Sequence, residues 1–177
     1  VCCHLGRPLE AKILIEEVLE STLSTMEKAL AAVRYGVILT DLCCFDDATA
    51  AFRKAEDWIP DDCHKHDLLM RLHGSRGQTY LYQALCLSNT ETRLALFKSA
   101  LIDLECAHRF AEEEEDIARD KYYMFLAYAL HRPDRITEQM RRETEECCAP
   151  SKSYPFFVRA QWLACYRALL LGLPDMG

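Results

Sequence analysis

The sequence predicts an all-α protein of about eight helices, and three observations support that prediction. Half of the 177 residues are hydrophobic, and they recur at spacings of three and four, which places them on one side of a helix. Only 6 Gly and 6 Pro are present, whereas a strand-rich sandwich needs frequent turns. The connections between periodic stretches are a few residues long, so consecutive helices must pair as antiparallel hairpins. We expect a single helical domain over residues 1–177.

The predicted helices begin and end at recognisable signals. Pro8, Pro133 and Pro155 lie at first-turn positions, where the missing N–H leaves no helical hydrogen bond unmade. Ser24 and Glu27 have the spacing of a capping box. The expected helices span residues 9–20, 24–44, 47–58, 62–87, 91–112, 115–131, 134–147 and 154–171.

A set of small and large apolar residues between positions 36 and 60 is typical of one helical hairpin. Gly36 and Ala48 are small enough to let two antiparallel helices approach, and we expect them to face each other at a close crossing. Phe52 and Ala55 can then pack against the next hairpin, and Pro60 ends the second helix. The full set is Gly36, Leu39, Ala48, Phe52, Ala55 and Pro60.

This spacing closely resembles one tetratricopeptide repeat (TPR). A looser copy begins at Gly77 and continues, after a lengthened loop, to Ala100, Leu104 and Ala107. The two glycines are 41 residues apart, more than the usual period of about 34, so the chain resembles the extended repeats of kinesin light chain and the Pins adaptors. The resemblance implies hairpins stacked as a TPR-like α-solenoid. An ordinary helical bundle is the alternative.

The spacing of a second repeat helix also occurs upstream, at Ala11, Ile15 and Val18, without a first helix before it. This half-repeat leads us to expect that the array continues N-terminally in the parent protein.

The resemblance also predicts a binding surface. In TPR proteins the first helices of successive repeats line a concave groove, where chaperone-binding members hold a carboxylate with Lys and Asn. The matching positions of this chain are mixed apolar and polar, so we expect a peptide helix or an extended segment instead. The predicted partner-binding residues are Val33, Val37 and Asp41 in the first copy and Arg71, Gln78 and Tyr82 in the second.

The helix expected at 154–171 is apolar around nearly its whole circumference. A terminal helix should present a polar side to water. We therefore expect its outer side, with Trp162 and Tyr166, to be covered by a further repeat, a second copy of the chain or a partner protein. The alternative is that this helix folds back and plugs the groove.

Potential metal ligands lack the partners that a site needs. Cys63, His64 and His66 form the densest group, but no second Cys/His pair has the spacing of a zinc site. Glu105 and His108 have the i, i+3 spacing of di-iron bundles, but no second such motif faces them. No cysteine lies in a recognisable nucleophile signature. We expect no metal, no cofactor and no enzymatic activity.

Charge and cysteine content narrow the class of partner. A net charge of −7 without a basic stripe disfavours nucleic acid. The 10 cysteines and the lack of an N-terminal signal peptide fit a reducing compartment, the cytoplasm or the nucleus, and the longest uncharged run is too short to cross a membrane.

The sequence thus predicts a non-catalytic adaptor or scaffold segment that binds a protein or peptide. The alternative is a regulatory or structural helical domain of a larger enzyme or complex, without a ligand of its own.

Overall fold

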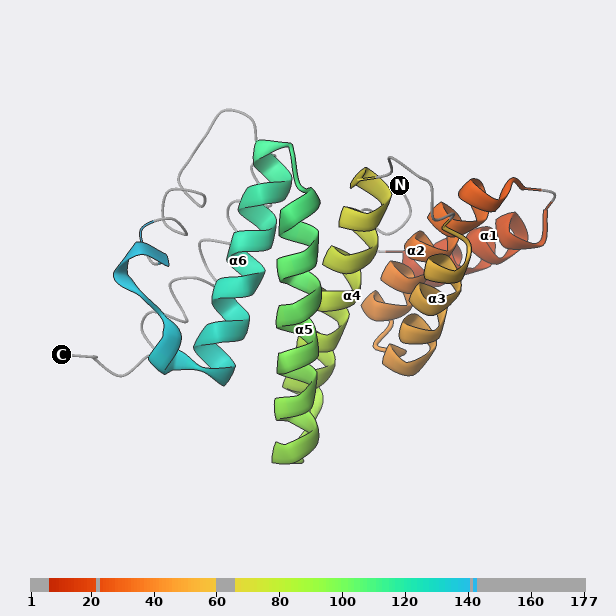
Figure 1. The fold of residues 1–177 in the computed structure, drawn as a ribbon. Helices are drawn as coiled ribbons and strands as arrows, with labels where there is room; N and C mark the ends of the chain where they lie inside the picture. Colours follow the sequence, from red (N-terminus) through yellow and green to blue (C-terminus); the bar gives the residue numbers. More distant parts are fainter. Residues whose placement is uncertain (1–6, 22, 60–65, 141, 143–177) are drawn as a thin grey trace. The chain divides into compact units, whose positions relative to one another are not determined.

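The computed structural model describes residues 7–21, 23–59, 66–140 and 142, and every regular element in those ranges is a helix (Figure 1). The predicted all-α class is confirmed. The chain divides into two compact units, residues 1–110 and 111–177, and each is described by itself. The first unit contains α1 (Pro8–Glu20), α2 (Thr25–Asp41), α3 (Phe45–Asp57), α4 (His66–Cys86) and α5 (Thr90–Phe110). The second contains α6 (Glu114–His131) and the 3-10 helix η2 (Pro133–Arg135).

Three helices of the first unit begin where local chemistry favours a helix start. Pro8 is the first residue of α1. The capping box before α2 is confirmed: the Ser24 N–H donates to Glu27 Oε2 over 2.9 Å, and the Glu27 N–H donates to Ser24 Oγ over 3.3 Å. At the start of α5, the Thr92 N–H donates to Asn89 Oδ1 over 2.9 Å. Each of the last two arrangements satisfies a backbone N–H that the helix itself cannot.

Two hairpins, α2/α3 and α4/α5, form the centre of the first unit, and the two helices of each lie side by side (Figure 1). Both hairpins use a glycine in the same way. A Cβ on Gly36 would lie 2.5 Å from Phe52 Cε1, and one on Gly77 would lie 2.8 Å from Leu104 Cγ. A glycine on the first helix therefore lets a large, fully buried side chain of the second helix approach its backbone.

The nearest side chain to Gly36 differs from the expected one. The sequence suggested Ala48 opposite Gly36, but the Phe52 ring lies closest. Ala48 is fully buried as well. Because Phe52 follows Ala48 by one helical turn, the two occupy the same side of α3, and the longer side chain reaches the glycine.

The prediction of a lengthened loop in the second hairpin is wrong. Residues 42–44 connect α2 to α3, and residues 87–89 connect α4 to α5, so the loops are equally short. The additional residues lie in the helices: α4 extends nine residues beyond Gly77, whereas α2 extends five beyond Gly36. The α4/α5 hairpin therefore has a longer tip, which exposes Leu85 and Leu94.

Helices α2 and α4 pack against each other and run parallel. Near their N-terminal ends, Leu68 and Leu72 of α4 share a core cluster with Ala29 and Val33 of α2. Near their C-terminal ends, the hydroxyl groups of Thr40 and Thr79, both buried, lie 2.7 Å apart and hydrogen-bond. Each hydroxyl also lies 2.8 Å from a carbonyl of its own helix, Thr40 from Gly36 and Thr79 from Ser75, so one hydroxyl donates to the other while the accepting one donates within its own helix.

Helix α1 packs on α2 through buried Ala11, and the Tyr35 hydroxyl donates to Glu16 Oε1 over 2.6 Å. Burial and this hydrogen bond to a carboxylate raise the pKa of Tyr35 to about 12. Four apolar residues of α1 are exposed, namely Leu9, Ile13, Leu14 and Val18.

The second unit has a core of its own, built from Tyr122, Phe125 and Ala129 of α6 and from Ile136. Arg119 bridges Asp116 and the fully buried Asp120. The helix expected from residue 134 is wrong at its start, because residues 133–135 form η2 and residues 136 and 137 are not helical. A 3-10 turn tolerates Pro133 for the same reason as a first α-helical turn, since its N–H has no partner there.

Some expectations lie outside the described residues, namely the helix at 154–171 with Trp162 and Tyr166, the helix breaker Pro60, and Cys63 and His64. Within the described part of the chain, no helix is long and apolar enough to cross a membrane.

Candidate functional site

The candidate site is the surface that α2 and α4 form together on one side. Thr40 and Thr79 mark the directions in which the two helices face each other. At about 100° per residue, Val37 and Asp41 lie about 60–100° around α2 from Thr40, and Gln78 and Tyr82 lie about 60–100° around α4 from Thr79 in the opposite sense. Because the helices are parallel, these positions fall on the same side. We call this surface the α2–α4 face; its residues are Arg34, Val37 and Asp41 of α2 and Arg71, Gln78 and Tyr82 of α4.

Five of the six predicted residues in the first unit are accessible on this face. Asp41 and Arg71 are exposed, Gln78 is half-buried, and the exposed fractions of Val37 and Tyr82 are 37% and 36%. The side chains of Val37 and Tyr82 are thus partly accessible to solvent.

Val33 is a correction to the predicted set. It is only 3% exposed and belongs to the core cluster with Leu68 and Leu72. Val33 lies about 20° around α2 from Thr40, so its side chain points at α4 and not at the open side. A partner cannot reach it without separating the two helices.

Charges are separated along the face. Toward the C-terminal end of α2 the order is Arg34, just past the midpoint of the helix, then Val37, then Asp41, its last residue. On α4 the order is Arg71, Gln78 and Tyr82. Because Thr40 and Thr79 lie at the same level, Tyr82 lies beside or slightly beyond Asp41. Arg71 also forms an exposed ion pair with Asp67 of its own helix at 2.9 Å, and exposed pairs of this kind contribute little to stability. The partial charges of the two parallel helices have the same sense, positive at the N-terminal ends and negative at the C-terminal ends.

An open depression of about 350 Å³ lies beyond the acidic end of the face. It surrounds the turn between α2 and α3, where Cys43 adopts a positive φ of 59°. The Gln83 side chain of α4 reaches across this turn and donates to Asp46 Oδ1 over 3.3 Å. The residues that line it are Cys43, Cys44, Phe45, Asp46, Asp47 and Gln83.

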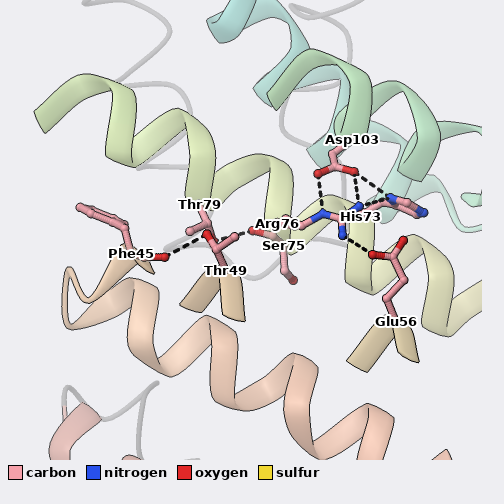
Figure 2. Close-up of polar contacts among 8 residues, drawn as sticks. All are labelled: Phe45, Thr49, Glu56, His73, Ser75, Arg76, Thr79 and Asp103. Atoms are coloured by element: carbon pink, nitrogen blue, oxygen red, sulfur yellow. Dashed lines mark hydrogen bonds and ion pairs between the residues drawn. The ribbon is translucent and has the colours of Figure 1, made fainter. Parts of the chain in front are cut away.

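A polar network that joins α3, α4 and α5 restrains the orientation of α4. Arg76 donates to both oxygens of Asp103 on α5, over 2.7 and 2.8 Å, and to Glu56 Oε2 on α3, over 2.7 Å (Figure 2). His73 Nδ1 lies 2.8 Å from Asp103 Oδ1. One guanidinium group thus joins three helices, through the nearly buried Asp103 and the exposed Glu56.

The network changes the acidity of its members. Burial alone would raise the pKa of Asp103, but the hydrogen bonds from Arg76 and His73 outweigh it and hold this pKa below its ordinary value. The hydrogen bonds to Asp103 raise the pKa of Arg76 against the opposing effect of burial. Both groups are therefore charged at neutral pH, and His73, beside an acceptor-only carboxylate, donates through Nδ1. A paired and immobile arrangement of this kind fits a structural role.

The described residues contain no group of three or more His, Cys, Asp or Glu side chains that could hold a metal ion. The His66 ring lies tilted against the Phe110 ring, with the ring centroids 5.5 Å apart.

Sequence reasoning missed Arg34 and the buried network, although both left a signal. Arg34 precedes Val37 and Asp41 by three and seven residues, the spacing of one helix side. Asp103 lies between Ala100 and Ala107 on the apolar side of its helix, where a carboxylate must find a partner. The partner itself, on another helix, could not be read from that pattern.

Comparison with protein-family models, curated proteins and solved structures gave no match for this chain.

Proposed function

We propose that this chain is a non-catalytic adaptor or scaffold segment that binds a peptide or protein segment across the α2–α4 face. The observation that carries the proposal is the exposure of Val37 and Tyr82 on one side of two parallel helices, framed by Arg34, Arg71 and Asp41. Apolar side chains surrounded by polar ones are what a specific docking surface needs, since the first supply affinity and the second supply register.

The packing of the two hairpins supports a TPR-like stack as the architecture behind this surface. Gly36 and Phe52 in the first hairpin correspond to Gly77 and Leu104 in the second. In a stack of this kind, the first helices of successive hairpins lie next to each other. Helices α2 and α4 do so, and the hydroxyl groups of Thr40 and Thr79 form a hydrogen bond between them. The binding surface then comes from the repetition itself, because each added hairpin extends it by one helix.

The proposal places the chain in a reducing compartment, the cytoplasm or the nucleus. Cys43, Cys44, Cys86 and Cys106 are free thiols, and the first three are exposed, which suits such a compartment. Nucleic acid is not the proposed partner, because the face carries an acidic residue as well as basic ones.

The test is affinity capture from a lysate of the source cells with the wild-type chain and the double variant Val37→Glu/Tyr82→Ala. Both changes are at exposed positions, so circular dichroism should remain helical while the captured partner is lost. Val37→Ala/Tyr82→Phe is the conservative control and should retain it. Full retention by the first variant would show that binding occurs elsewhere.

A second candidate is a structural domain that is buried in a larger assembly. Two neighbouring apolar residues of α1 favour it, since Leu9 and Ile13, one helical turn apart, are 66% and 58% exposed, and adjoining exposed apolar side chains are typical of a protein contact. In the same capture experiment, Ile13→Glu/Leu14→Glu should leave the proposed partner bound. Loss with this variant alone would favour the structural candidate.

A further inference from the structure

The charged residues of the α2–α4 face are ordered along the helices. Its basic residues, Arg34 and Arg71, precede Val37 and Asp41 along the direction that both helices share, and its acidic residue, Asp41, lies at the C-terminal end of α2. Asp46 and Asp47 add exposed negative charge at that same end.

We infer that the bound segment carries an acidic side chain at one end, an apolar middle and a basic side chain at the other end. The inference rests on the proposed function of this face and adds the chemistry of its partner. The acidic group lies over Arg34 and Arg71, the apolar group lies over Val37, and the basic group lies at Asp41, at the level of Tyr82 and beside the depression at the α2–α3 turn.

Helix geometry sets the distance between the two charges. Arg34 and Asp41 are seven residues apart on α2, a rise of about 10 Å at 1.5 Å per residue. An extended segment advances about 3.3 Å per residue, so its acidic and basic residues should be about three residues apart. Reversing the charges of the segment would place like charges against each other at both ends, which is how a surface of this kind excludes wrong partners.

The test uses the whole chain and a library of random dodecapeptides displayed on phage. Peptides are selected on the wild type and counter-selected on Val37→Glu/Tyr82→Ala, so that only ligands of the face remain. The expected consensus has an acidic and a basic residue about three positions apart with an apolar residue between them.

Charge exchange then tests the polarity directly. The variant Arg34→Glu/Asp41→Lys keeps the net charge of the chain and changes two exposed side chains. Selected peptides should bind it about tenfold more weakly than the wild type, from two exposed ion pairs of up to about 1 kcal/mol each. Synthetic peptides with their acidic and basic residues exchanged should regain that affinity on the variant.

The outcomes separate the two proposals. Peptides that depend on Val37 and Tyr82 but bind the charge-exchanged variant as tightly as the wild type would overturn the inferred polarity and leave the proposed function standing. A selection that enriches nothing above the counter-selected variant would overturn the proposed function, and the inference with it.

Discussion

The two hairpins of the first unit solve the same packing problem with different supports. In α2/α3 the Phe52 ring packs against Gly36, and the surrounding contacts are apolar. In α4/α5 the smaller Leu104 packs against Gly77, and the Arg76–Asp103 network supplies additional connections. The glycine and the large residue opposite it are thus common to both hairpins, whereas the further contacts that stabilise each hairpin differ.

The largest effect should come from breaking the network of the second hairpin. Asp103→Ala leaves Arg76 nearly buried without its bidentate partner, so the free energy of unfolding should fall by about 3–5 kcal/mol. Urea unfolding followed by Trp58 fluorescence in a Trp162→Phe background reports this for the first unit. The double variant Arg76→Met/Asp103→Leu is the control and should be less destabilised than Asp103→Ala. Equal losses would show that the charges are not coupled.

A smaller loss should follow from adding a methyl group to the first hairpin. Gly36→Ala places a Cβ against the fully buried Phe52 ring and should cost about 1–3 kcal/mol by overpacking, although alanine is the better helix former. Phe52→Leu reproduces the residue pair of the second hairpin, so Gly36→Ala should cost less in that background. Independent, additive effects in this double-mutant cycle would contradict the contact.

The capping residues should contribute about equally in the two hairpins. Ser24→Ala removes the capping box of α2, and Asn89→Ala removes the acceptor for the Thr92 N–H of α5. Each should lower stability by about 1 kcal/mol, measured by the same urea titration. Ser24→Asp, which keeps an acceptor, should retain most of it, and a loss as large as that of Ser24→Ala would rule out the capping explanation.

Acid should affect the second hairpin through a single carboxylate. The pKa of Asp103 is lowered in the folded chain, so its stabilising contribution is present above the ordinary aspartate pKa of about 4 and is lost as pH falls through the folded value. Urea titrations between neutral pH and pH 3 should show a decline in stability that is shallower in Asp103→Asn. An identical decline in that variant would place the acid sensitivity elsewhere.

The sequence predicted the helices and the close approach at the two glycines well, because these depend on local spacing. Ser24 with Glu27, the two glycines and the large residues that follow them all lie within one hairpin. The accessible residues of the α2–α4 face were predicted less fully. Val33 is buried because it packs against Leu68 and Leu72, which are more than 30 residues away in the sequence, and a local pattern does not show such a contact. The prediction of a lengthened loop was wrong for a related reason. Ser88 and Asn89 indicate where the helical pattern is interrupted, but they do not indicate how far the helix on either side extends.

Site-specific photocrosslinking tests whether a partner binds across the α2–α4 face. A photoreactive phenylalanine analogue at Tyr82 lies on the α2–α4 face, and the same analogue at Ala50 lies on an exposed position of α3. Illumination in a lysate of the source cells should attach a defined protein at position 82 and not at position 50, and the adduct should be lost with Val37→Glu. The same adduct at both positions, or one that is insensitive to Val37→Glu, would contradict the account.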